Sequence, residues 1–137
     1  MKIRPYLTYQ GTCQDAIALY ERAFKTQATE ILRFSDILSN AESPIPERFK
    51  DQIVQAILPI GGDFIRLSDC PTELNCPESE RISLAIEASV DEVKYAFEVL
   101  SIDGRVAIPL ERTFYSPLAG VVFDEFGVMW NFIGQND

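Results

Sequence analysis

Residues 113–132 of the chain read TFYSPLAGVVFDEFGVMWNF, which is two apolar runs separated by the short acidic sequence D-E-F-G. The residue types in these runs favour β-strands at 118–123 and 128–133, and Gly127 suits a tight turn between them. The sequence therefore predicts a β-hairpin. At this point the hairpin is either scaffolding or one wall of a binding pocket.

A similar hairpin is predicted earlier in the chain. Residues 53–60 (IVQAILPI) turn through 61–63 (GGD) into 64–69 (FIRLSD). Each of the two hairpins follows a strand-like run, a stretch with a helical apolar stripe and a further strand-like run. The helices are expected at 13–24 and 90–100, and this repetition indicates that the fold is built from two copies of one module.

Local signals mark the ends of the two helices. Thr12 with Asp15 three residues later has the pattern of a capping box, and Ser89 with Glu92 has the same pattern. Gly104 is typical of the residue that follows the end of a helix. Both helix starts are thus predicted from residues next to them in the sequence.

The pattern predicts an α+β fold of two βαβββ modules. The first module covers 1–69 and includes a strand at 28–36 and a polar loop at 37–50. A Pro-rich, acidic linker at 70–80 precedes the second module at 81–137. We expect one helix to cover one face of each sheet, and the other faces of two curved sheets to meet across a cleft within one domain.

Composition excludes several classes of function. The net charge of −9 argues against a nucleic-acid partner, because phosphate backbones are bound by clustered Lys and Arg. No apolar run reaches the length of about 18 residues that a membrane span needs. The odd number of cysteines (Cys13, Cys70 and Cys76) favours a reducing cytoplasm over a disulfide framework. The chain has no histidine, which excludes Ser-His-Asp, Cys-His and His-rich metal sites.

Several stretches resemble the PhnB-like branch of the vicinal oxygen chelate superfamily, which includes glyoxalases, extradiol dioxygenases and bleomycin-resistance proteins. They are PYLTYQGTCQDAIALYERAF (5–24), ILRFSD (31–36), RLSD (66–69) and PLERTFYSPLAGVVFDEFGVMW (109–130). The resemblance covers nearly the whole chain and implies the duplicated βαβββ fold. It does not imply a particular reaction, because one fold supports many activities.

The resemblance also implies where a metal ion would bind in metal-dependent relatives, which place His or Glu on the first and last strands of each half. Those positions correspond here to Pro5, Arg66, a residue near Ile82, and Asn131. Gln55 stands where many PhnB-like sequences have His. Such residues do not form a divalent-cation site, so we expect no metal and no other cofactor.

Alternation along the strands suggests which side chains face the cleft. Arg66 interrupts an apolar run and shares a face with Phe64; it either faces the cleft or pairs locally with Asp63 or Asp69. Asn131 shares its face with Met129, whereas Trp130 is expected in the core. We expect a small polar or anionic ligand to contact the following side chains: Gln55, Arg66, Asn131, Met129 and, at the rim, Tyr115.

Other residues with reactive side chains have simpler interpretations. The start of a helix could favour a thiolate at Cys13, but a small buried side chain is the default. Asp124 and Glu125 lie in the predicted turn and are expected to be solvated. No catalytic residue is identified, and whether the protein is an enzyme stays open.

Two functions remain, with a third behind them. The first is a metal-free protein that binds a small molecule in the cleft. The second is a diverged enzyme, lyase/isomerase-like or transferase-like, that acts on a small polar or anionic substrate. The third is a dimer with a vestigial cleft. The absence of histidine and of metal ligands favours binding, and a homodimer is expected because eight short strands leave sheet edges uncovered.

Overall fold

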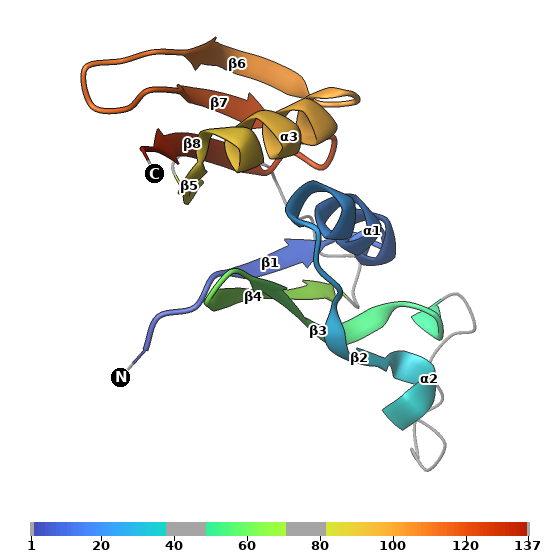
Figure 1. Cartoon of the computed structure of the whole chain (residues 1–137). Helices are drawn as coiled ribbons and strands as arrows, with labels where there is room; N and C mark the ends of the chain where they lie inside the picture. The colour runs from blue at the N-terminus through green and yellow to red at the C-terminus, as the bar shows by residue number, and fades with distance from the viewer. Residues whose placement is uncertain (1, 38–48, 71–81, 137) are drawn as a thin grey trace. The chain divides into compact units, whose positions relative to one another are not determined.

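The computed structural model describes residues 2–37, 49–70 and 82–136, which form two βαβββ modules (Figure 1). In chain order the elements are β1 (Tyr6–Tyr9), α1 (Cys13–Phe24), β2 (Thr29–Arg33), α2 (Phe34–Ile37), β3 (Ile53–Ile60), β4 (Asp63–Asp69), β5 (Leu84–Ser89), α3 (Val90–Ser101), β6 (Arg105–Glu111), β7 (Ala119–Phe123) and β8 (Met129–Gln135). Most of the predicted linker at 70–80 and most of the predicted loop at 37–50 lie outside the described residues.

The strands form two four-stranded sheets. The first has the order β1-β4-β3-β2 and the second the order β5-β8-β7-β6. In each sheet one pair is parallel, β1 with β4 and β5 with β8, and the other neighbours are antiparallel. This arrangement confirms the predicted α+β class and the duplicated βαβββ modules.

The chain divides into two compact units, which are described separately. One comprises Met1–Glu21 and Thr26–Cys76, and the other comprises Arg22–Lys25 and Pro77–Asp137. The cleft between the sheets stays a prediction.

The strand predicted at 28–36 is too long. β2 ends at Arg33, and the next four residues form the short helix α2. The Asp36 carboxylate accepts a hydrogen bond from the Arg33 amide at 2.8 Å, which turns the chain out of the strand. Phe34 is the first residue of α2 and is buried. The sequence pattern predicts this apolar residue in the strand, but it belongs to the core as part of a helical turn.

In the first unit, the core lies between α1 and one face of the sheet. Ile65 and Leu67 of β4 are buried, as are Ala16 and Ile17 of α1. The hydroxyl groups of Tyr9 and Tyr20 are 2.7 Å apart in this interior, so each polar tip has a partner.

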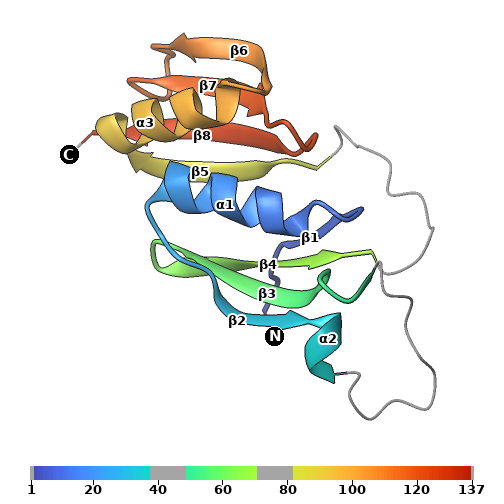
Figure 2. The ribbon, with the colours of Figure 1, turned by 90° about the vertical axis from the view of Figure 1, so that its right-hand side faces the viewer.

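In the second unit, α3 lies against the sheet on the face that carries Trp130 and Phe132 (Figures 1 and 2). Both rings are fully buried, and Phe97 of α3 meets Phe132 edge-on with ring centroids 5.9 Å apart. The prediction that Trp130 belongs to the core is confirmed.

Asp124, expected to be solvated, is buried with 3% of its surface exposed. Its Oδ1 accepts hydrogen bonds from the amides of Phe126 and Val128 at 2.9 and 3.1 Å, and its Oδ2 accepts one from Trp130 Nε1 at 2.9 Å. The expectation was wrong because the turn folds back over its own aspartate, which becomes the acceptor for donors that would otherwise be buried alone.

The helix starts differ between the modules. The capping box of Ser89 and Glu92 is present in both directions, as predicted. For α1, no hydrogen bond in the described part of the chain joins the Thr12 side chain to a helix amide, so that predicted capping box is wrong. Instead Asp69, from the end of β4, accepts a hydrogen bond from the Cys13 amide at 2.9 Å through Oδ1.

Asp69 also holds the start of β3. Its Oδ2 accepts a hydrogen bond from the Ile53 amide at 2.9 Å, and the carboxylate is only 4% exposed. One buried side chain therefore joins α1, β3 and β4.

Gly104 has a different role from the one expected. Its φ angle is not positive, but a Cβ at this position would lie 2.2 Å from the Phe123 carbonyl oxygen and 2.5 Å from that of Leu100. The position thus requires glycine because the end of α3 passes close to the end of β7.

Replacing Asp69 with Asn should lower the free energy of unfolding by about 2–4 kcal/mol, because an amide group has one acceptor oxygen for two buried N–H donors. Urea denaturation followed by circular dichroism measures this change. Asp63→Asn is the matched control; its side chain is 85% exposed, and we expect a change within about 0.5 kcal/mol. Equal effects of the two substitutions would contradict the role given to Asp69.

Candidate functional site

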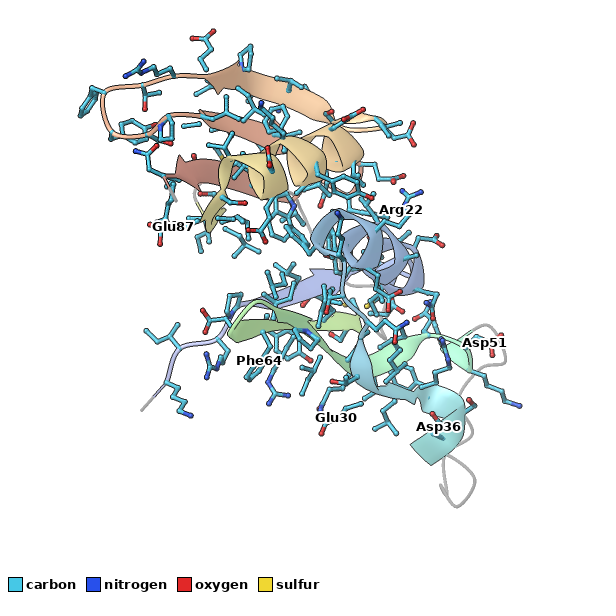
Figure 3. The ribbon with its side chains drawn as sticks, in the orientation of Figure 1. Arg22, Glu30, Asp36, Asp51, Phe64 and Glu87 are labelled. Carbon is cyan, nitrogen blue, oxygen red and sulfur yellow. The ribbon has the colours of Figure 1, made fainter. Side chains whose placement is uncertain are left out.

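The open face of the first sheet is the face away from α1. Strand pairing places Tyr6, Arg66, Ile57 and Thr29 side by side across all four strands. Tyr6 and Thr29 are exposed, and Arg66 and Ile57 are half-buried, so no described element covers this row completely. Figure 3 shows Phe64, two residues before Arg66, on the side of the sheet opposite α1.

Arg66 lies on this face, and none of the described residues gives it a carboxylate partner. Asp69 is occupied by the amides of Cys13 and Ile53, and Asp63 accepts from Arg4 at 3.4 Å. Among the described residues, the Arg66 guanidinium contacts the Phe64 ring, 5.6 Å from its centroid. The alternative that Arg66 pairs locally with Asp63 or Asp69 is therefore not seen.

Gln55 is on the same face of the same sheet. It lies two residues before Ile57, the direct neighbour of Arg66, so Gln55 and Arg66 are diagonal neighbours with Cα atoms about 7–8 Å apart. The Gln55 side chain is half-buried and makes no hydrogen bond with the residues that the structure describes. An amide and a guanidinium on one sheet face offer several donors and one acceptor to a ligand.

The corresponding residues of the second sheet lie on its open face. Asn131 pairs with Val121 of β7 and Ala85 of β5, and Met129 pairs with Phe123. Both predicted site residues are half-buried, and the Asn131 amide donates a hydrogen bond to Ser83 Oγ at 3.2 Å. Asn131 and Met129 thus share one face, as alternation along the strand predicted.

Tyr115 lies outside both strands of this hairpin, on the loop after β6. It is 60% exposed, and its ring meets the fully exposed ring of Phe114 edge-on with centroids 5.1 Å apart. The loop is fastened beneath them, because the buried Ser116 hydroxyl donates to the Gly134 carbonyl at 2.6 Å and Thr113 pairs with the Ser116 backbone. The aromatic pair is therefore held in solvent by a well-bonded loop.

The predicted site residues thus fall into two groups, Gln55 with Arg66 on the first sheet and Asn131 with Met129 on the second, and Tyr115 lies on the loop after β6. Sequence reasoning missed Arg4, which lies before β1 and contacts Phe64. Its position follows from the parallel pairing of β1 with β4. The sequence does not show which residues of the two strands lie opposite each other.

Glu30 was also missed. It has φ +53°, a left-handed conformation that is unfavourable for Glu, and it lies where β2 has an extra residue opposite β3. Figure 3 shows Glu30 on the same side of the sheet as Phe64. The bulge therefore places a carboxylate on the open face.

The Cys13 thiol is an unsuitable nucleophile. It is fully buried, and burial together with the nearby negative charge of Asp69 raises its pKa to about 12, with Arg33 acting in the opposite direction. The thiol is therefore protonated at neutral pH, and burial outweighs the effect of the helix start.

The residues at the superfamily's metal positions do not fit a metal ion. Pro5, Arg66 and Asn131 offer no anionic ligand, and Ile82 is an exposed apolar residue. Across residues 2–37, 49–70 and 82–136, no group of three or more His, Cys, Asp or Glu side chains is placed to hold a metal. In the same residues no helix is long and apolar enough to cross a membrane.

Comparison with known proteins places this geometry in a family. The chain is 29% identical to Protein YjdN of Escherichia coli (strain K12) over 136 residues, which cover 95% of this chain and 92% of that protein. The crystal structure of PA1353 from Pseudomonas aeruginosa is similar with TM-score 0.84 and 28% identity, over 100% of this chain and 99% of the other.

The PhnB protein from Bacillus cereus shares the fold, with TM-score 0.79 and 21% identity over 98% of this chain and 100% of that chain. The family model of the Glyoxalase/Bleomycin resistance protein/Dioxygenase superfamily matches residues 2–132. The chain therefore belongs to this superfamily, and a PhnB protein is among the solved structures that share its fold.

Proposed function

We propose that this protein binds a small polar or anionic molecule without a metal ion, and that Arg66 holds the negatively charged group. The observation that supports this most directly is the half-buried Arg66, which lacks a carboxylate partner in the described residues. A partly desolvated guanidinium without a counter-ion is costly, and an anionic ligand would remove that cost. Gln55 is the second contact on the same face.

Asn131 and Met129 extend the proposal to the second sheet, and Tyr115 remains the predicted rim residue. Asn131 offers an amide and Met129 an adaptable apolar surface, which together with Arg66 suits a small ligand with one charged and one apolar end. The cleft that would bring them together is part of the proposal. The odd number of cysteines supports a cytoplasmic location.

Arg66→Met should weaken binding of a small anion at least about tenfold, because hydrogen bonds to a charged group contribute about 1.5–3 kcal/mol each. The melting temperature without ligand should stay within a few degrees. A thermal-shift screen of carboxylates and phosphates, run with and without a chelator, identifies ligands, and calorimetry gives the Kd. Arg22→Met is the control, since it removes an exposed Arg from α1. Unchanged affinity of the Arg66 variant for every ligand found would contradict the proposal.

A homodimer is the second part of the proposal. Phe114 is fully exposed on the fastened loop after β6, and Ile108 of the edge strand β6 is 55% exposed. Pro109 in β6 has no amide hydrogen, which disfavours direct strand pairing at this edge. A second copy would therefore meet this region through apolar side chains rather than by extending the sheet.

Light scattering should give the mass of a dimer at tens of micromolar. The double substitution of Phe114 and Tyr115 by Ser should shift the protein toward the monomer with little change in its far-ultraviolet circular dichroism, because both rings are exposed within one chain. Ile102→Ser, which changes an exposed apolar residue after α3, is the control. A wild-type protein that is monomeric at this concentration would exclude the dimer.

A diverged enzyme is the second candidate function, and Glu30 is the observation that favours it. Glu at φ +53° costs on the order of 1 kcal/mol relative to Gly, and such strain is often found at functional sites. A carboxylate on the same face as Arg66 could accept a proton from a bound substrate.

Mass spectrometry distinguishes this candidate from simple binding. Each anion that binds through Arg66 is incubated with the protein; a binding protein returns it unchanged, and an enzyme converts it. If conversion occurs, Glu30→Gln should reduce it at least about a hundredfold while the thermal shift with the ligand remains. Glu30→Gly should raise the free energy of unfolding by about 1 kcal/mol, which checks the strain separately. Full conversion by Glu30→Gln would exclude Glu30 as the base.

A further inference from the structure

Two guanidinium groups share one aromatic ring on the open face of the first sheet. The Arg4 guanidinium carbon lies 4.4 Å from the centroid of the Phe64 ring, and that of Arg66 lies 5.6 Å from the same centroid. The parallel pairing of Tyr6 with Arg66 accounts for this arrangement, because it places Arg4 beside Phe64. Two like charges are thus brought together in a protein whose net charge is −9.

Neither charge is well compensated within the described residues. The single ion pair of Arg4 is with Asp63, at 3.4 Å, and the Asp63 side chain is 85% exposed. Such exposed pairs are weak and are screened by salt. Arg66 has no ion pair in the part of the chain that the structure describes. Contact with the Phe64 ring orients both guanidinium groups but does not neutralise them.

Repulsion between two neighbouring cations is relieved best by a ligand with two negative charges. Arg also offers paired N–H groups in a planar fork, which matches phosphate and carboxylate oxygens. Both guanidinium groups lie within 5.6 Å of the centroid of the Phe64 ring, so one small ligand beside the ring is near both. The two guanidinium groups therefore favour a ligand that carries two negative charges and is small enough to bind beside one ring.

We propose that Arg4, Phe64 and Arg66 form a site selective for a dianionic group, either a phosphate monoester or two carboxylates on one small molecule. This inference rests on the proposed binding function and adds a specificity-determining residue, Arg4, to it. Arg66 binds the first charge, and Arg4 distinguishes a dianion from a monoanion.

Matched probes test this selectivity. Methyl phosphate is a dianion at pH 8, because its second pKa is about 6, and dimethyl phosphate is a monoanion of similar shape. Malonate and acetate form the corresponding carboxylate pair. The Kd of each probe is measured by calorimetry on the full chain at constant ionic strength, for wild type, Arg4→Met and Arg66→Met. Lys2→Met is the control, since it removes one charge from the same segment, and in the described part of the chain the cations that contact the Phe64 ring are Arg4 and Arg66.

The wild type should bind one dianion at least about tenfold more tightly than its matched monoanion. Arg4→Met should reduce this ratio to less than about twofold and keep the monoanion affinity, and Lys2→Met should leave the ratio unchanged. Preference for methyl phosphate or for malonate identifies which kind of dianion is bound. Phe64→Leu should reduce the ratio as well, and circular dichroism verifies that each variant is folded.

Four results would overturn the inference, and they have different consequences for the proposed function. If Arg66→Met abolishes binding but Arg4→Met keeps the wild-type ratio, the dianion site is wrong and the anion-binding function stands. If wild type binds dianion and monoanion equally, the dianion site is again wrong and the anion-binding function again stands. If wild type binds none of the four probes but binds another anion through Arg66, the selectivity for dianions is excluded; if it binds no anion at all, both proposals fail.

Discussion

The Asp69 carboxylate is the interaction on which the first module depends. Each of its oxygens accepts an amide hydrogen from a different element, one from the start of α1 and one from the start of β3, and the residue itself ends β4. An ionised carboxylate is tolerated in the interior only when donors surround it, and here the donors are backbone groups that need an acceptor. Helix, sheet and strand end are therefore fixed relative to one another by one side chain.

In the second module the start of the helix and the buried carboxylate are hydrogen-bonded to residues close to them in the chain. Its helix starts with a capping box between Ser89 and Glu92, and its buried carboxylate, Asp124, closes the turn between β7 and β8. The two modules thus share a topology, but different side-chain hydrogen bonds stabilise it in each. In the first module the end of β4 is tied to the helix, and the neighbouring residues of β4 on the opposite face include Arg66. Asp69 therefore fixes the end of the strand that carries Arg66.

The sequence predicted the alternation along the strands and one capping box, and missed contacts both between distant strands and within turns. Alternation along β4 and β8 correctly separated Ile65 and Leu67 from Arg66, and Trp130 from Asn131, because burial on one face follows the period of the strand. The capping box at Ser89 was predictable for the same reason.

Several of the failures involve contacts that adjacent residues do not reveal. At the start of α1 the described side-chain acceptor is the Asp69 carboxylate from β4, which accepts from the Cys13 amide, and that contact joins residues far apart in the chain. Arg4 could not be placed beside Phe64 without the register of the β1–β4 pair, and Asp124 could not be known to be buried without the position of Trp130. Sequence reasoning therefore predicted the faces of the sheets but not the neighbours on each face.

The burial of Cys13 has a consequence for how the protein withstands oxidants. The thiolate is the form that attacks peroxides and disulfides, and a buried thiol with a pKa of about 12 is almost never in that form at neutral pH. Since the Cys13 amide is bonded to Asp69, exposing the sulfur requires the start of α1 to separate from the sheet. An oxidised Cys13 in protein taken from cells would therefore be a chemical record that the molecule had opened before it was collected.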